Sequence, residues 1–362
     1  MAFIQQIVPW VTSKERAALD RYLRTGGWLT EFTETQELER RLAKFLGVRY
    51  VSLTNNGTVA LFLALKAVGV GQGDEVIVPN LTMVATPNAV RLAGATPVLA
   101  DVDEGSLCID STKLKKTKKT KALIHVSLNG RAGNIEAVRR WCTKNKVHFI
   151  EDACQAFASK HRGKFLGTFG EIGCFSMSPH KIITTGQGGF VATNRRDLYE
   201  RVERLKDFGR LAGGADFHDA LGFNFKFTDV QAVLGLAQLG NISERVRRKR
   251  KLYKRYRDLL ADVGAVRFHE TNLRETTPWF VDIYVPARRR AALAARLKRA
   301  GVGSRPLYPA VSTQPIYRRR SRTKLLVSER VAREGLWLPS SVTLTKSEVQ
   351  LVCRTIREFF NA

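Results

Sequence analysis

Lys181 stands in a polar, glycine-rich segment, Ser178–Gly188, between two stretches that look like strands. A lysine flanked by hydroxyl residues and glycines suits a Schiff-base lysine beside a phosphate site, because glycine lets the backbone approach a ligand closely. Any surface lysine would satisfy part of this description. The segment therefore indicates a reactive site only if other chemically useful residues converge on it.

Asp152 follows the apolar run Phe149-Ile150, at the point where a strand is expected to end. Ligands of open α/β sheets bind at the carboxyl ends of the strands. In enzymes that use pyridoxal phosphate, such a carboxylate pairs with the protonated ring nitrogen and keeps the ring an electron sink. A helix N-cap is the alternative role for this aspartate.

A third stretch, Asn55-Asn56-Gly57-Thr58, lies between a predicted strand and a predicted helix. Free backbone N–H groups at a helix start, with a hydroxyl beside them, can hold a phosphate. Gly57 permits the close turn. The same strand-turn-helix pattern also occurs as an ordinary connection in α/β proteins, so this stretch alone does not decide between the two.

The elements around these stretches predict a doubly wound α/β core. Short apolar runs alternate with helical spacing, which is the pattern of a mostly parallel sheet with helices on both faces. Strands are expected at Tyr50–Leu53, Glu75–Val78, Pro97–Asp101, Ala122–Val126, His148–Glu151, Gly173–Met177 and Gly189–Thr193, and helices at Val59–Val68 and Ile135–Lys144.

A smaller C-terminal unit is expected after the core. One long helix is predicted from Val230 through Leu239 into the basic run Arg245–Arg257, joining a large domain of residues 1–240 to an α+β domain of residues 241–362. A strand at Phe280–Val285 and helices at Ala291–Ala300 and Lys346–Phe360 complete the smaller domain. We expect the N-terminal segment to be able to pack against it.

The chain is strongly basic, with 60 Lys and Arg against 33 Asp and Glu and a formal net charge of +27. From Asn241 onward, 28 basic residues face 10 acidic ones, so the charge is concentrated toward the C-terminus. Such a surplus keeps open a nucleic-acid-binding protein. However, the basic positions between Arg245 and Arg257 wrap more than one helix face, and few aromatic residues lie among them. A solvated helix is favoured, and nucleic acid is not the expected partner.

Cysteine spacing and hydropathy narrow the class further. Even the closest pair, Cys142 and Cys154, is twelve positions apart, so there is no C-x-x-C motif and no metal site is predicted. The five cysteines are expected to be buried or reduced thiols. Because no apolar run is long enough to span a membrane and the N-terminus does not resemble a secretory signal, we expect a cytoplasmic protein with no membrane partner.

Taken in order, the motifs closely resemble the DegT/DnrJ/EryC1/StrS family of pyridoxal-phosphate-dependent sugar aminotransferases. The matching stretches cover nearly the whole chain: Gly26–Thr30, Asn56–Leu61, Val76–Pro79, Gly94–Val98, Glu151–Ala156, Ser176–Gly189, Gly222–Ala232, Ser304–Pro306 and Gly335–Ser340. The resemblance implies a fold-type-I, aspartate-aminotransferase-like architecture. It also implies pyridoxal 5'-phosphate as cofactor, with pyridoxamine phosphate between the two half-reactions, and L-glutamate and a nucleotide-linked keto sugar as substrates.

The resemblance also implies residue roles. Lys181 would bind the cofactor covalently and shuttle a proton, Asp152 would hold the pyridine nitrogen, and Gln155 would lie near the phenolic edge of the ring. Ser176 and the Gly57-Thr58 turn would bind the phosphate.

Asn224 would reach the same phosphate from the neighbouring subunit, so the resemblance implies a homodimer with shared active sites. Trp28, His180 and Arg305 are weaker candidates for substrate contact. Each has an alternative: a packing aromatic, a histidine that points away, and a solvated arginine.

Two departures from the family pattern concern the cofactor site. Met83 follows Thr82 where most members have an aromatic ring stacked on the cofactor, although a thioether can also cover a ring face. Gln187 replaces a glutamate in the family's Gly-Glu-Gly-Gly segment. We expect both replacements to be compatible with activity.

Within the family, Lys206–Arg210 and Gly222–Asn224 look most like enzymes of the perosamine-synthase type. Those enzymes aminate C4 of a GDP-linked 4-keto-6-deoxyhexose, GDP-4-keto-6-deoxymannose giving GDP-perosamine. Transaminases for dTDP- or UDP-linked keto sugars use nearly the same scaffold and remain alternatives.

Overall fold

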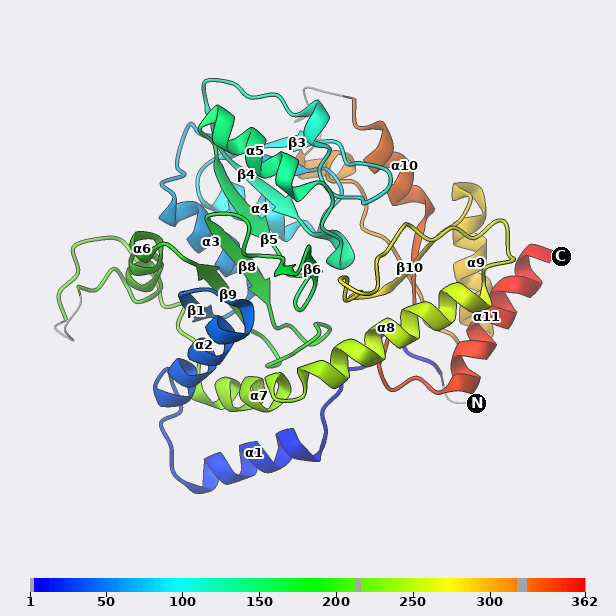
Figure 1. Ribbon diagram of the computed structural model, residues 1–362, viewed down its shortest axis with the longest axis horizontal. Coiled ribbons are helices and arrows are strands. Elements are labelled where there is room, and N and C mark those ends of the chain that lie inside the picture. The colour runs from blue at the N-terminus through cyan, green and yellow to red at the C-terminus, as the bar shows by residue number, and fades with distance from the viewer. Residues whose placement is uncertain (1–2, 212–215, 318–323, 362) are drawn as a thin grey trace.

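A computed structural model describes residues 3–211, 216–317 and 324–361 and shows a large α/β unit beside a smaller C-terminal one (Figure 1). The large unit is built on a seven-stranded sheet in the order β1-β9-β8-β5-β4-β2-β3. Its strands are β1 (Tyr50–Thr54), β2 (Glu75–Pro79), β3 (Thr96–Ala100), β4 (Thr120–Val126), β5 (His148–Asp152), β8 (Ile172–Ser176) and β9 (Gly189–Thr193). Strand β9 pairs antiparallel with both of its neighbours, β1 and β8, while the other pairs in this sheet are parallel, so the predicted mostly parallel core is confirmed.

Helices cover both faces of the large sheet. On one face pack α2 (Thr33–Leu46), α5 (Ile135–Asn145) and α7 (Asp229–Leu239); on the other pack α3 (Gly57–Ala67), α4 (Ala85–Leu92) and α6 (Arg196–Lys206). Strand periodicity divides the core between the faces, since Leu123 of β4 lies with the first set while Ile124 lies with the second. Burial of the strands on both faces explains the continuous apolar runs in the sequence.

The C-terminal unit contains a three-stranded antiparallel sheet, ordered β10-β12-β11. Its strands are β10 (Val281–Tyr284), β11 (Arg305–Pro306) and β12 (Gly335–Leu338), and its helices are α9 (Ala287–Arg299), α10 (Leu326–Glu334) and α11 (Lys346–Asn361). Near the N-terminus, Ile4 forms a parallel bridge with Val302 and is buried in the core of this unit. The domain division at residue 240 stays a prediction.

The predicted single helix across residues 230–257 is wrong, because two helices occupy this region. Helix α7 ends at Leu239 and α8 (Ile242–Leu259) begins after Gly240-Asn241. The Gly240 N–H still bonds to Leu236 O, but the next N–H, from Asn241, bonds back to Gln238 O in a tighter turn. Figure 1 shows α8 extending away from the large sheet toward α11.

The basic run on α8 is only partly solvated, which corrects the expectation of a solvated helix. Arg245 is buried and its Nη2 lies 2.9 Å from Glu15 Oε1. Lys249 is also buried, and its ammonium donates to Trp279 O at 2.7 Å and Ser340 O at 2.8 Å. Arg245 and Lys249 are therefore committed to the interior, whereas the other basic side chains of the run are exposed or partly exposed.

The remaining elements are short or peripheral. Helix α1 (Ser13–Arg24) begins with a capping box in which Thr12 and Glu15 bond each other's backbone N–H groups. Strands β6 (Lys160–His161) and β7 (Lys164–Phe165) form a hairpin, and the 3₁₀ turns are η1 (Ser111–Lys113), η2 (Leu128–Gly130), η3 (Val311–Thr313) and η4 (Pro315–Tyr317). Within the described residues, none of the helices combines the length and apolarity that crossing a bilayer requires.

Candidate active site

Lys181 lies in the connection between β8 and β9, at the edge of the sheet where β8 ends. The connection closes on itself, since Met177 N donates to Gly188 O at 2.7 Å and Thr185 N donates to Met177 O at 3.0 Å. The Lys181 N–H donates to Ser178 O at 3.0 Å. Because the two strands pair directly, the loop is held at both ends and presents Lys181 from a fixed base.

The Lys181 side chain is half-buried, and its ammonium lies 4.0 Å from the centroid of the Trp279 ring. Burial lowers the pKa of Lys181, while Cys154 and Asp152 oppose that change. A lysine with a lowered pKa is neutral, and therefore nucleophilic, over a wider pH range.

Asp152 ends β5 and is buried, as its place in the sequence predicted. Thr86 Oγ1 donates to its Oδ2 at 2.7 Å, and Cys154 N donates to its Oδ1 at 3.1 Å. Thr86 Oγ1 is also 3.0 Å from Thr82 Oγ1, so two hydroxyls line up behind the carboxylate. These bonds fix the orientation of Asp152 next to Lys181.

Gly57 is the first residue of α3, and its backbone lies against Cys154 and Ser176. A Cβ at this position would lie 2.8 Å from Cys154 Sγ and 2.9 Å from Ser176 Cβ. Asn56 caps the helix by accepting from Val59 N at 3.0 Å, while the first N–H groups of a helix have no intrahelical partner. Gly57 therefore packs against Ser176 at the amino terminus of α3, and Thr58 follows it in the first turn. We call Gly57, Thr58 and Ser176 the Gly57 cradle.

Gln155 is buried, and its Oε1 accepts from Asn129 N at 3.0 Å. Asn129 has a positive φ of 52° and bonds both backbone groups of Phe280: its Nδ2 donates to Phe280 O at 2.9 Å and its Oδ1 accepts from Phe280 N at 2.8 Å. Gln155 is thereby tied to the C-terminal unit at the residue next to Trp279.

Met83 stands just before α4, three residues before the threonine that bonds Asp152. Its O accepts from Thr86 N at 3.1 Å, and its Sδ accepts from Ala85 N at 3.0 Å. The side chain is 44% exposed. The predicted role of Met83 as a cover for the cofactor ring stays a prediction.

Arg305 and His180 lie at the rim of the site. The Arg305 guanidinium lies 5.5 Å from the Trp337 ring centroid, and both Lys181 and Arg305 add to the effect of burial in lowering the pKa of His180. Tyr308 packs edge-on against Trp337 at 4.7 Å. Burial raises the pKa of Tyr308, and its phenol lies within the electrostatic reach of Arg305 and Asp152.

Sequence reasoning missed Trp279 and Tyr308. Trp279 follows Pro278 just before β10, and Tyr308 follows β11, so both come from the C-terminal unit and no spacing relates them to Lys181. An aromatic residue beside a short strand usually indicates only core packing. The tertiary structure alone reveals that these two rings face the large unit.

Trp28 and Asn224 lie outside the group of residues around Lys181. Trp28 is 63% exposed and lines a cavity of about 800 Å³ between α1, α2 and α7, together with Tyr22 and Phe32. Asn224 is exposed, and its Oδ1 accepts from Lys226 N at 3.4 Å. The structure does not bring these side chains to Lys181 within one chain, and their predicted roles stay predictions.

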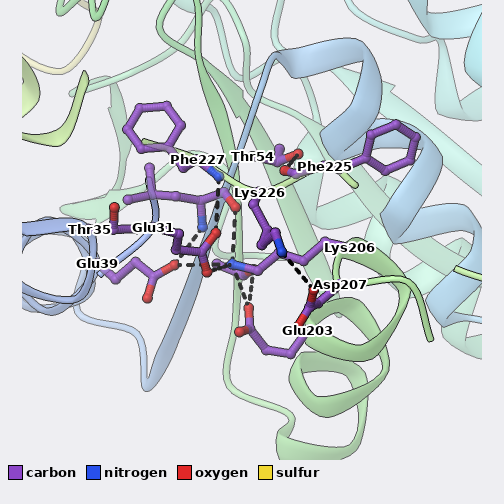
Figure 2. Close-up of polar contacts among 12 residues, drawn as sticks. Glu31, Thr35, Glu39, Thr54, Glu203, Lys206, Asp207, Phe225, Lys226 and Phe227 are labelled. Carbon is purple, nitrogen blue, oxygen red and sulfur yellow. Dashed lines mark hydrogen bonds and ion pairs between the residues drawn. The ribbon is translucent and has the colours of Figure 1, made fainter. Parts of the chain in front are cut away.

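Residues Phe225–Phe227, which we call the strap, cross the carboxyl end of β1 (Figure 2). Thr54 Oγ1 donates to Phe225 O at 3.0 Å, and Asn55 Nδ2 donates to Lys226 O at 3.2 Å. Phe227 N donates to Glu31 Oε2 at 3.0 Å. The strap therefore joins the N-terminal segment to the turn that leads into the Gly57 cradle.

The ammonium of Lys206 lies among carboxylates beside this strap, as Figure 2 shows. It lies 2.9 Å from Glu31, 3.1 Å from Glu203 and 3.7 Å from Glu39, and it donates to Leu53 O at 3.3 Å. Burial opposes its charge, but the three carboxylates outweigh burial and raise the pKa of Lys206. Burial raises the pKa of Glu39 to about 7.

The residues around Lys181 fit pyridoxal phosphate. Asp152 offers a buried, oriented carboxylate for a ring nitrogen, and the cradle offers backbone N–H groups and hydroxyls for a phosphate. A Cβ at Gly57 would collide with Cys154 Sγ and Ser176 Cβ. Lys181, expected as the covalent attachment point, lies within the electrostatic field of Asp152.

The family model of the DegT/DnrJ/EryC1/StrS aminotransferases matches residues 10–357. The chain belongs to this family. The GDP-perosamine synthase of Escherichia coli O157:H7 is 34% identical, with each chain covered completely. The UDP-2-acetamido-2-deoxy-3-oxo-D-glucuronate aminotransferase of Pseudomonas aeruginosa is 32% identical over 96% of each chain.

Among solved structures, the aminotransferase TlmJ from Streptoalloteichus hindustanus is 30% identical, and 99% of each chain superposes with a TM-score of 0.94. The predicted fold-type-I architecture is thereby confirmed. The predicted enzyme class, a pyridoxal-phosphate-dependent nucleotide-sugar aminotransferase, is confirmed by the family match and the similar proteins.

Proposed function

We propose that this DegT/DnrJ/EryC1/StrS aminotransferase moves an amino group from L-glutamate to C4 of a nucleotide-linked 4-keto-6-deoxyhexose. The foremost substrate is GDP-4-keto-6-deoxymannose, which gives GDP-perosamine. Full-length similarity to proteins named GDP-perosamine synthase from Escherichia coli O157:H7 and Vibrio cholerae supports this choice. An aminotransferase whose name specifies a UDP-linked sugar is almost as similar, so dTDP- and UDP-linked keto sugars are the alternative substrates.

The observation that carries the proposal is the meeting of Lys181, Asp152 and the Gly57 cradle at one edge of the sheet. When bound, pyridoxal phosphate would supply an electron sink for the carbanion that transamination develops. Asp152, oriented by Thr86, would hold the ring nitrogen, and Gln155 would lie at the phenolic edge.

Lys181 would be the attachment point and would move protons at its Nζ. Burial lowers the pKa of Lys181, which widens the pH range over which its neutral amine can accept a proton. Gly57, Thr58 and Ser176 would hold the phosphate, and Met83 would cover the ring. These roles are consistent with one connected site.

For the substrates, Arg305 would bind a carboxylate through its guanidinium fork, while His180 and Trp28 would contact the sugar nucleotide. Asn224 would complete the phosphate site of a neighbouring subunit, so the functional unit would be a homodimer. Its exposed position just before the strap suits a residue that reaches another chain.

A substrate panel tests the proposal. Purified protein supplied with pyridoxal phosphate and L-glutamate is incubated with GDP-, dTDP- and UDP-linked 4-keto-6-deoxyhexoses, and amino-sugar products are measured by mass spectrometry. We expect the GDP-linked sugar to give the highest kcat/KM, with ping-pong kinetics because the amino group is transferred in two stages.

Lys181→Ala is the matched control. It should fold, keep non-covalent affinity for pyridoxal phosphate, and lose both the visible absorbance of the attached cofactor and all transfer. Preference for a UDP- or dTDP-linked sugar would select the alternative substrate class. An unchanged spectrum in Lys181→Ala would overturn the assignment of the attachment point.

A further inference from the structure

Trp279 presents the face of its indole ring to the amine of Lys181. The Lys181 Nζ lies 4.0 Å from the ring centroid, well inside the range in which a cation is attracted to the negative face of an aromatic ring. Tryptophan provides the strongest such face among the natural side chains. The contact joins the reacting nitrogen of the large unit to a residue of the C-terminal unit.

The ring is fixed on several sides. Its Nε1–H donates at 2.8 Å to the carbonyl of His180, the residue just before Lys181. It stacks on Phe280 at 3.9 Å, and Trp337 packs against it at a 67° angle. Lys249 bonds its carbonyl at 2.7 Å. A ring held in this way is preorganised as a surface for the lysine.

The Trp279 ring can add to the stabilisation of the charged Lys181 amine. Burial disfavours the charged form of the Lys181 amine, while Cys154 and Asp152 favour it. A charged amine at this place has therefore lost part of its hydration. A tryptophan face partly replaces the lost hydration.

We propose that Trp279 is a positioning residue for the reaction: it receives the protonated Lys181 amine whenever that amine is not bonded to the cofactor, and so holds the proton donor at one place. This rests on the proposed role of Lys181 as attachment point and proton carrier. A partly exposed amine without such a contact would sample many rotamers. A resting place against a fixed ring shortens its return to the reacting atoms.

Graded fluorination of tryptophan tests the contact without changing its shape. The apoprotein is produced with mono-, di- and tetrafluorotryptophan, which progressively weaken the negative ring face. The pH dependence of cyanate carbamylation then gives the pKa of the Lys181 amine, because only the neutral amine reacts. Mass spectrometry reads peptide 172–200, in which Lys181 is the single lysine.

We expect the pKa of Lys181 to fall with each added fluorine, by a total of about half a unit to one and a half units. The chain has five tryptophans, so the series is repeated in Trp279→Phe, where the dependence on fluorination should vanish. A pKa that does not change with confirmed fluorine incorporation would overturn the proposal, as would an equal slope in Trp279→Phe.

Carbamylation needs no cofactor, so the two proposals can fail separately. If pyridoxal phosphate attaches elsewhere while the Lys181 pKa still follows fluorination, the proposed attachment point is wrong and the ring contact is only structural, which overturns this inference as a reaction role. If attachment at Lys181 holds and the pKa is insensitive to fluorination, only the role of Trp279 is wrong. Wild-type attachment with a graded pKa supports both.

Discussion

The Gly57→Ala substitution gives the sharpest test of the phosphate cradle. The new Cβ would lie 2.8 Å from Cys154 Sγ, 2.9 Å from Ser176 Cβ and 3.4 Å from Phe175 O. The first two separations are shorter than real Cβ contacts, so the helix amino terminus must move away from β8 or the two side chains must shift. Overpacking of this kind costs about 1–3 kcal/mol.

Two effects of the substitution have opposite signs and act on different equilibria. Alanine favours helix over glycine by up to about 1 kcal/mol, which offsets part of the strain in the free energy of unfolding. Cofactor binding gains nothing from helix propensity, because α3 is formed in both the free and the bound protein. If about 1.4–2.8 kcal/mol of strain falls on the bound state, the Kd for pyridoxal phosphate rises about 10- to 100-fold.

The assay titrates apoprotein with pyridoxal phosphate and compares urea unfolding of the same samples. Gly264→Ala is the matched control, because a Cβ at Gly264 meets nothing within 4 Å and its φ is not positive. Adding Cys154→Ala to Gly57→Ala removes one of the two short contacts, so the pair should be less than additive. A Gly57→Ala protein that binds pyridoxal phosphate as tightly as Gly264→Ala would refute the assignment of the cradle.

Two further predictions concern stability. Arg131 and Asp282 form a buried ion pair between the two units, with N···O distances of 2.8 and 2.9 Å. Asp282→Asn should therefore lower the free energy of unfolding by about 3–5 kcal/mol, and the double variant Arg131→Met/Asp282→Leu should lower it much less, because no unpaired charge stays buried. Equal losses in urea titrations would contradict this origin. Since the pKa of Glu39 is raised to about 7 by burial, the folded protein keeps a proton that the unfolded chain releases, so stability should decline as pH rises from about 4.5 to 7. Glu39→Gln should make this decline shallower in Tm measurements across that range, and an unchanged slope would assign the decline to other groups.

The strands of the large sheet and several residues of the candidate site were predictable from the sequence. Apolar runs bounded by turn residues located the strands of the large sheet to within a few residues, because a strand buried on both faces must be apolar throughout. The same runs placed Asp152 at the end of a strand and Lys181 in the loop between two strands, and ligands of open α/β sheets bind at the carboxyl ends of the strands. Ordered motifs then indicated the family that the comparisons confirmed.

The sequence did not predict which of the basic side chains are buried. The basic positions of α8 suggested a solvated helix, yet Arg245 is paired with Glu15 and Lys249 bonds two carbonyls. A buried cation depends on partners that come from distant parts of the chain, so composition alone does not reveal it. Lys206, with carboxylates from α2, α6 and the segment before α2, is a further case.

By itself, the sequence determined which residues near the ends of the predicted strands have side chains suited to bind a cofactor. What only the tertiary structure decided is which rings and cations from the C-terminal unit complete the site. Trp279 lies against Lys181 because β10 docks beside the Asn129 turn, and that docking depends on long-range contacts such as Asn129 with Phe280 and Arg131 with Asp282. Local spacing carries no information about such contacts, since they form only when separately folded layers pack together.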